Sequence, residues 1–333
     1  MQIFLTSSES KLRVRDGMFE VSYYDKEGNL QKSQHAPALL KGIWLHDGAS
    51  ITVAAIRLAM QNDVDLVICN RRGIPEGRLL GFRPSTTSLV QKAQALVSIS
   101  PQALEYARGW IVRKLQSQAE YLECLVMRRS AQQKKSLELA IQHIREMLGK
   151  AQTLDMSPPK SSESPASTPT AILRGLEGSA SRSFYAALAE VIPPQYTFEG
   201  RSKRPARDIF NAFLNYAFGI LYRKIECALT AAGMNSYIGF MHRDGYQFKS
   251  LVYDFIEPFR TDMVRAVFTL FSKKLIKINT HAVVSPDGSV ELTNAGIGVL
   301  AQKVNKFYEK KTVFESLNMS REMAIEKEAR RLA

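Results

Sequence analysis

Two periods of apolar residues divide the chain into a strand-rich part and a helical part. Along 12–23 apolar and polar side chains alternate, and this two-residue period is typical of strands. Asp16 and Gly17 interrupt the alternation at a place that predicts a hairpin turn. From about Thr87 onward the apolar positions recur three and four residues apart. That second period predicts helices for most of the remaining chain.

The strand-rich part also contains the pattern of one helix. Apolar residues keep helical spacing along 50–61, whereas 64–69 (VDLVIC) is a short apolar run that predicts a buried strand. Turn-forming residues follow that strand in the sequence RRGIPEGR. We therefore expect a sheet with one helix packed on it.

Three helical blocks follow, at 87–99, 101–129 and 130–151, and Pro101 suits the first turn of the second block. The composition then changes abruptly at 156–170, MSPPKSSESPASTPT, which holds 4 of the 13 prolines and almost no apolar side chains. Such a segment cannot contribute to a core. We expect a mobile loop there.

The change of period, rather than the Pro/Ser-rich loop, places the domain boundary. Linkers of this composition commonly separate domains. Here, however, the helical pattern is similar on both sides of 156–170, and the period changes near residue 88. The prediction is an α+β protein with a small β-rich N-terminal domain at 1–88 and a larger all-α domain at 89–333.

The charge of the chain points to a polyanionic partner. It has 45 basic and 32 acidic residues, a formal net charge of +13, and most of this excess lies beyond residue 90. Three cysteines without a CxxC pair suggest neither disulfides nor a thiolate zinc site. No stretch approaches the ~20 apolar residues that span a bilayer, so we expect a cytoplasmic protein without a membrane partner.

No phosphate-binding loop or hydrolase motif is present, but three segments carry acids and a histidine that can be interpreted as a metal site. Glu177 lies in the glycine-containing segment LRGLEGSASRSFY, and His242 ends the segment YIGFMH. Asp254 and Glu257 are three residues apart, so on a helix their Cβ atoms lie ~5–6 Å apart and the carboxylates can share one cation. An ordinary solvated glutamate, a packed histidine and a solvated helix face are the alternatives.

Basic residues cluster in the same part of the chain. A shared surface that follows phosphates is the preferred interpretation, and solvated helix faces are the alternative. Phe248 beside Lys249 can stack on bases, although most aromatic residues are expected in the core. The candidate nucleic-acid-binding residues are Arg174, Arg201, Arg204, Arg207, Arg243 and Lys249.

Four ordered segments together resemble the CRISPR-associated adaptation integrase family, the "Cas one" family. They are the segment around Glu177, the block 198–222 (FEGRSKRPARDIFNAFLNYAFGILY), GMNSYIGFMH ending at His242, and SLVYDFIEPFR at 250–260. The resemblance covers nearly the whole chain. It implies a β-rich N-terminal domain followed by a helical catalytic domain, the same division that the periodicity predicts.

The resemblance also implies a site, a cofactor and partners. Glu177, His242 and Glu257 are expected to bind Mg²⁺ or Mn²⁺, with Asp254 as a further catalytic acid of less defined role. The chain is expected to form a homodimer through its N-terminal domain, which also guides DNA ends. With a small "Cas two" partner it would insert prespacer DNA into the CRISPR repeat array.

The expected reaction is a metal-dependent transesterification, in which the 3′-hydroxyl of a prespacer end attacks a repeat phosphodiester. With water as the nucleophile the same site would act as an endonuclease. Two alternatives stay open, namely a DNA-binding scaffold without enzymatic activity and a stand-alone metal-dependent nuclease.

Overall fold

The computed structural model separates into two compact units, Met1–Thr86 and Thr87–Ala333, here called the N-terminal unit and the helical unit. The structure describes residues 2–5, 9–25, 27–40, 42–62, 64–69, 75–79, 87–127, 129–157, 168–196, 198–202, 204–242, 245, 248–314 and 316–333. Most of the Pro/Ser-rich stretch at 156–170, predicted to be a mobile loop, lies outside these residues.

The N-terminal unit contains two four-stranded sheets in the described residues, with strand orders β1-β5-β7-β8 and β4-β3-β2-β6. β1, β5 and β7 are parallel, and β8 is antiparallel to β7. The elements are β1 (Gln2–Leu5), β2 (Lys11–Arg15), β3 (Met18–Tyr24), β4 (Leu30–His35), β5 (Gly42–Leu45), β6 (Ser50–Ile51), α1 (Val53–Gln61), β7 (Asp65–Cys69) and β8 (Pro75–Leu79).

The sequence pattern explains the second of these sheets. β2 and β3 pair through the turn at Asp16 and Gly17, both of which have positive φ (52° and 72°), as the predicted hairpin requires. Leu12 and Phe19 bury their side chains completely in the core of this unit. The helix predicted at 50–61 forms as α1 and begins at Val53, with Thr52 as its N-cap. Ser50 and Ile51, the first residues of the predicted helix, instead form β6 and pair with β2.

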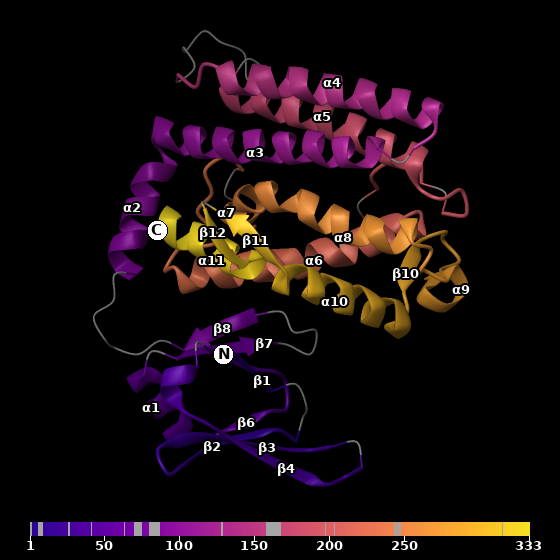
Figure 1. Cartoon of the computed structure of the whole chain (residues 1–333). Helices are drawn as coiled ribbons and strands as arrows, with labels where there is room; N and C mark the ends of the chain where they lie inside the picture. The colour runs from indigo at the N-terminus through magenta and orange to yellow at the C-terminus, as the bar shows by residue number, and fades with distance from the viewer. Residues whose placement is uncertain are drawn as a thin grey trace. The chain divides into compact units, whose positions relative to one another are not determined.

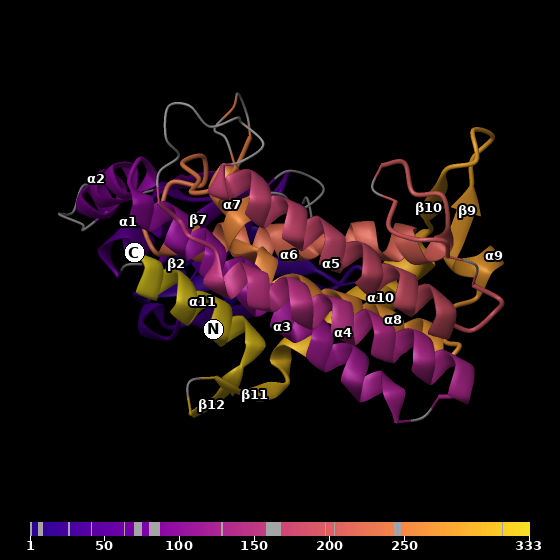
Figure 2. The same ribbon diagram turned by 90° about the horizontal axis from the view of Figure 1, so that it is seen from above.

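The helical unit packs its helices in two groups. Figures 1 and 2 show α3, α4 and α5 running side by side, while α6, α8 and α10 form the group that packs beneath them. The helices are α2 (Thr87–Ser98), α3 (Pro101–Val126), α4 (Ala131–Thr153), α5 (Pro169–Val191), α6 (Ile209–Ala231), α7 (Ser250–Phe255), η3 (Glu257–Phe259), α8 (Arg260–Ser272), α9 (Ile278–His281), α10 (Asn294–Glu309) and α11 (Arg321–Leu332).

Two antiparallel strand pairs accompany these helices and were not predicted from the sequence. β9 (Ala282–Val284) pairs with β10 (Val290–Leu292), and β11 (Lys311–Phe314) pairs with β12 (Leu317–Ser320). These strands are only three or four residues long, too short for a clear alternation of apolar and polar positions.

Among the described residues, none of the helices combines the length and the apolarity that crossing a bilayer requires.

A continuous aromatic and aliphatic core joins the two groups of helices. Phe184 of α5, Phe210 of α6 and Phe268 and Phe271 of α8 are fully or almost fully buried. The rings of Phe210 and Phe271 meet edge to face with centroids 5.1 Å apart. This core fixes α3, α5 and the α7–η3 segment relative to one another, and those three segments carry Lys114, Glu177, Asp254 and Glu257.

Candidate active site

The first predicted acid, Glu177, projects from the middle of α5. Thr168 caps this helix by accepting a hydrogen bond from the Ala171 amide, and Pro169 follows in the first turn. Leu173, Ala180 and Phe184 form a buried stripe, so this side of α5 packs against the core. The Glu177 carboxylate stays partly exposed.

A lysine of α3 connects Glu177 to the last predicted acid. The ammonium of Lys114 donates hydrogen bonds to Oε1 of Glu177 and, at 2.6 Å, to Oε2 of Glu257. Lys114 is 6% exposed. Burial alone would lower its pKa, but the charges of Glu257 and Glu177 outweigh burial and raise the pKa above its ordinary value. Two carboxylates that are 80 residues apart in sequence therefore converge on one cation.

Neighbouring side chains fix the other oxygens of this cluster. Ser181, one turn beyond Glu177, donates to Glu177 Oε1 at 2.8 Å, and Gln118 of α3 donates to the Ser181 hydroxyl at 3.3 Å. Lys114 and Gln118 are four residues apart on α3, as are Glu177 and Ser181 on α5. The facing turns of the two helices thus form a ladder of polar contacts.

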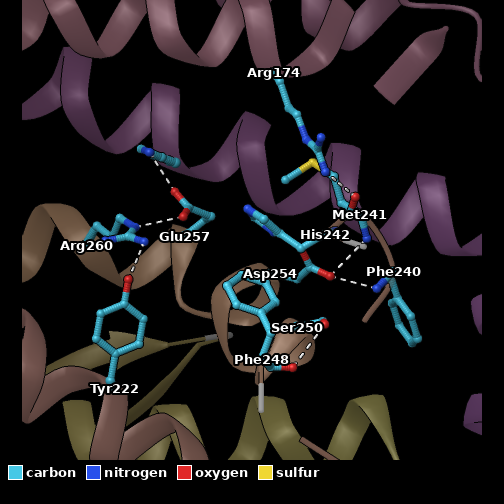
Figure 3. Close-up of polar contacts among 11 residues, drawn as sticks. Arg174, Tyr222, Phe240, Met241, His242, Phe248, Ser250, Asp254, Glu257 and Arg260 are labelled. Carbon is cyan, nitrogen blue, oxygen red and sulfur yellow. Dashed lines mark hydrogen bonds and ion pairs between the residues drawn. The ribbon is translucent and has the colours of Figure 1, made fainter. Parts of the chain in front are cut away.

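Glu257 has a second cationic partner. Its Oε1 accepts a 2.7 Å hydrogen bond from Nε of Arg260, whose guanidinium also donates to the Tyr222 hydroxyl at 2.8 Å (Figure 3). Burial would raise the pKa of Glu257, but Arg260 and Lys114 outweigh it and hold the pKa at about 2. Both oxygens of this buried carboxylate are therefore occupied by side-chain cations.

Asp254 has different partners, although it precedes Glu257 by three residues. α7 ends at Phe255 and the chain continues as the 3₁₀ turn η3. The Asp254 carboxylate accepts hydrogen bonds from the backbone amides of Phe240, Met241 and His242 at 2.6, 2.9 and 3.1 Å. The helical spacing suggested that Asp254 and Glu257 could share one cation; the structure instead gives each its own set of partners.

The same carboxylate orients His242. Nδ1 of His242 lies 2.5 Å from Oδ1 of Asp254. Because a carboxylate can only accept, Nδ1 is the donor in this contact, and a neutral ring held in this way has its lone pair on Nε2. In Figure 3 the imidazole ring extends from Asp254 toward the side on which the Glu257 carboxylate lies. A metal-ligating histidine typically has this arrangement, with one nitrogen bound to a carboxylate and the other available.

Gly239 makes this arrangement possible. A Cβ atom at this position would lie 2.5 Å from Cβ of Ser250 and 3.0 Å from Oδ2 of Asp254. The chain can therefore wrap around the Asp254 carboxylate only because residue 239 has no side chain. By contrast, a Cβ at Gly175, beside Glu177, would meet no described atom within 4 Å.

Two of the predicted nucleic-acid-binding arginines, Arg174 and Arg201, donate hydrogen bonds to other parts of the protein. Arg174 donates to the backbone oxygen of Met241 at 2.5 Å, which joins α5 to the His242 segment (Figure 3). Arg201 donates to Asn211 and Asn215 of α6 at 2.8 and 2.7 Å, and burial lowers its pKa. These two guanidiniums hold the scaffold of the site.

The remaining predicted cations are exposed, partly exposed or outside the described residues. Arg204 and Arg207 are exposed, and Arg207 donates to the backbone oxygen of Asp287 at 2.9 Å. Lys249 is paired with Glu226 at 2.6 Å. Arg243 lies outside the described residues. DNA contact by any of the six stays a prediction.

Sequence reasoning missed Lys114, Arg260, Tyr222 and Gly239. Lys114 had a usable signal, because it falls in register with the buried residues Trp110, Ile111 and Leu115 of α3. A lysine on the apolar face of a helix needs a buried acid. Arg260 follows Glu257 at helical spacing, but nothing in the sequence of Tyr222 or Gly239 marks their contacts.

Among the described residues, no group of three or more histidine, cysteine, aspartate or glutamate side chains is arranged so that it could hold a metal ion. The structure joins Glu177 with Glu257 through Lys114, and His242 with Asp254. The Glu177 and Glu257 carboxylates thus meet at the Lys114 ammonium, and Asp254, three residues before Glu257, holds His242.

Two solved structures share the fold of this chain. A structure described as a casposase bound to integration product matches 99% of this chain and 94% of its own, with a TM-score of 0.71 and 20% identity. A structure described as a partial Cas6-RT-Cas1–Cas2 complex matches 100% of this chain and 94% of its own, with a TM-score of 0.72 and 17% identity. The likeness confirms the predicted α+β fold.

Sequence comparison gives the family. A CRISPR-associated endonuclease Cas1 from Archaeoglobus fulgidus is 30% identical over 284 residues, which cover 83% of this chain and 80% of that protein. The family model for CRISPR-associated protein Cas1 matches residues 3–306. The resemblance carried by the four sequence segments is thereby confirmed, and the chain belongs to the CRISPR-associated Cas1 family.

Proposed function

We propose that this chain is the metal-dependent DNA integrase and endonuclease of CRISPR adaptation, which joins prespacer 3′-ends to the CRISPR repeat. The convergence of Glu177 and Glu257 on one buried cation carries the proposal, because burying these charges costs desolvation free energy that an apolar contact would not. His242, held by Asp254, provides a nitrogen on the neighbouring segment.

The side chains of the site fit a hard divalent cation. Glu177 and Glu257 already share one monovalent charge, which shows that their oxygens can approach a common cation. Carboxylates favour Mg²⁺, and the addition of an imidazole shifts the preference toward Mn²⁺. Glu177, Glu257 and Nε2 of His242 would hold the ion. Asp254 would not contact the ion and would instead orient His242 through its hydrogen bond to Nδ1.

Strand transfer places defined demands on these residues. The bound ion would supply Lewis-acid stabilisation of the phosphoryl oxygens. The 3′-hydroxyl of the incoming DNA end forms the new phosphodiester bond, its proton passes to solvent, and the repeat 3′-oxygen leaves. Arg260, held between Glu257 and Tyr222, adds positive charge next to the site. Arg174 keeps the His242 segment against α5.

DNA would bind to the basic residues at the surface of the helical unit. Arg204, Arg207 and Lys249 lie at the surface or partly exposed in the same unit as the acids, and Arg243 adjoins His242 in sequence. Their charges attract phosphates regardless of base sequence. Prespacer and repeat DNA are the proposed substrates, and the cytoplasm is the proposed compartment.

The N-terminal unit would supply the interface of a homodimer. Phe4 of β1 and Trp44 of β5 stack at 5.7 Å between ring centroids, and Phe4 is 54% exposed. Together with the partly buried Trp44, the exposed Phe4 ring offers an aromatic surface on this sheet that a second copy of the chain could cover. We also propose a small "Cas two" partner, because one solved structure of this fold is described as a Cas1–Cas2 complex.

The test is strand transfer by the purified protein with its partner, using a labelled prespacer and a supercoiled plasmid that carries a repeat. We expect Glu177→Gln, Glu257→Gln and His242→Ala each to lower the rate by ~10³ or more, since each removes a ligand or charge of the reacting site. EDTA should stop the wild type. Glu146→Gln, which changes an exposed acid paired with Lys150 on α4, is the matched control and should keep full activity.

The products separate this proposal from its alternatives. Joined DNA that depends on divalent metal supports integration. Cut DNA without joined products, under the same conditions, would instead identify a stand-alone nuclease. DNA binding with neither product, unchanged by EDTA, would identify a scaffold. Full strand transfer by the Glu177 and Glu257 variants would refute the assigned site.

A further inference from the structure

Lys114 is an unusual residue for the place it occupies. It lies on the inward face of α3, next to Ile111 and Leu115, which are almost completely buried. An ammonium at this depth loses its hydration and stays charged only if buried acids replace the water. The two acids that do so are the two carboxylates proposed to hold the metal ion.

Lys114 and Arg260 together contact both oxygens of Glu257. Its Oε2 accepts from Lys114, and its Oε1 accepts from Arg260. On Glu177, Oε1 accepts from both Lys114 and Ser181. A divalent ion that binds both glutamates therefore approaches oxygens that already contact the Lys114 ammonium, and the two positive charges repel each other. Arg260 contacts only Glu257 of the two acids, together with Tyr222, whereas Lys114 contacts both Glu177 and Glu257.

Lys114 has the properties of a cation that can be displaced. Its charge is a point at the end of four flexible methylene groups, so the ammonium can move by side-chain rotation while α3 stays in place. Arg260 is less able to leave, because its guanidinium is fixed at two ends by Glu257 and Tyr222. In the absence of any cation, the two carboxylates would repel each other.

We propose that Lys114 is a displaceable internal cation, which holds Glu177 and Glu257 together in the metal-free protein and must leave their oxygens when a divalent ion binds. Lys114 is thus a positioning residue that keeps the two acids converged and weakens the metal affinity of the free protein. This inference rests on the proposed function, because it takes the two glutamates as metal ligands.

The test compares Mn²⁺ binding by the full chain and by Lys114→Met, a change that keeps most of the side-chain length and removes the charge. Mn²⁺ affinity is measured by electron paramagnetic resonance titration at fixed pH and salt. We expect the variant to bind Mn²⁺ at least about fivefold more tightly, the low end of typical coupling between competing ligands. Its melting temperature should fall in EDTA, since two acids lose their shared partner, and should rise more with Mn²⁺ than that of the wild type.

Lys224→Met is the matched control. Lys224 of α6 is also partly buried and is paired with one acid, Glu322 of α11, at 2.6 Å. Its loss should leave Mn²⁺ affinity unchanged. If Lys114→Met does not fold, Lys114→Gln serves instead, because the amide can still donate to one carboxylate while the positive charge is gone.

The outcomes separate this inference from the proposed function. Equal or weaker Mn²⁺ binding by the Lys114 variants, with clear binding by the wild type, would overturn the inference alone. The absence of Mn²⁺ binding by the wild type and all variants would overturn the metal site itself. Tighter binding by Lys114→Met but not by Lys224→Met supports the inference.

Discussion

Asp254 and Glu257 are separated by three residues, yet the protein holds them by different means. Backbone amides of 240–242 and the His242 ring surround Asp254, which is 1% exposed. Glu257, 6% exposed, is held by the side chains of Lys114 and Arg260. Backbone donors cannot leave without unfolding the segment, whereas a side chain can rotate away. The first acid is therefore fixed for structure and the second can exchange its partners.

This difference assigns separate tasks to two acids of the same apparent motif. Asp254 fixes the position of the His242 ring and decides which nitrogen carries the proton. Glu257 stays ionised, with a pKa of about 2, because Arg260 and Lys114 outweigh the effect of burial. An ionised carboxylate with exchangeable partners is suited to accept a metal ion.

The largest expected effect on stability is that of Asp254→Ala. The change leaves three backbone amides and the histidine without their acceptor, so we expect the free energy of unfolding to fall by about 3–5 kcal/mol. Chemical denaturation of the metal-free protein measures it. Mn²⁺ should not restore the loss. Asp155→Ala, at an exposed acid that binds Ser157 locally, is the control and should change stability by less than ~0.5 kcal/mol. Equal effects of the two changes would remove the distinction between the acids.

Gly239→Ala should have the next largest effect. A methyl group would meet Cβ of Ser250 at 2.5 Å, and neither segment can move without loosening the Asp254 contacts. We expect a loss of about 1–3 kcal/mol, as for overpacked sites, seen as a lower denaturation midpoint.

Gly149→Ala, within α4, provides the opposite control. A Cβ there would meet no described atom within 4 Å, so the change should stabilise the protein by about 0.4–1 kcal/mol. If both alanine variants were stabilising, the close contact of the Gly239 backbone with Ser250 and Asp254 would be contradicted.

Much of the fold follows from local patterns. The hairpin at Asp16 and Gly17 needs residues that tolerate positive φ, and the sequence shows them. The blocks predicted at 101–129 and 130–151 form α3 and α4, because their apolar stripes repeat over many turns and Ser130 caps the second helix. The short pairs β9–β10 and β11–β12 escaped prediction because three or four residues carry too little periodicity.

The site could be predicted less completely. The resemblance to a family located Glu177, His242 and Glu257, but the separate role of Asp254 depends on where the backbone of 240–242 passes. Lys114 lies 63 residues from Glu177 and 143 from Glu257, and no local pattern connects residues so distant. Tertiary packing of α3 against α5 and η3 decides these contacts.

The most direct test of the central claim is a crystal of the protein soaked in Mn²⁺ and examined for anomalous scattering. We predict a peak between the carboxylates of Glu177 and Glu257, within coordination distance of Nε2 of His242, with the Lys114 ammonium moved off at least one carboxylate. Saturating Mn²⁺ without such a peak, and with Lys114 still bridging both acids, would contradict the account.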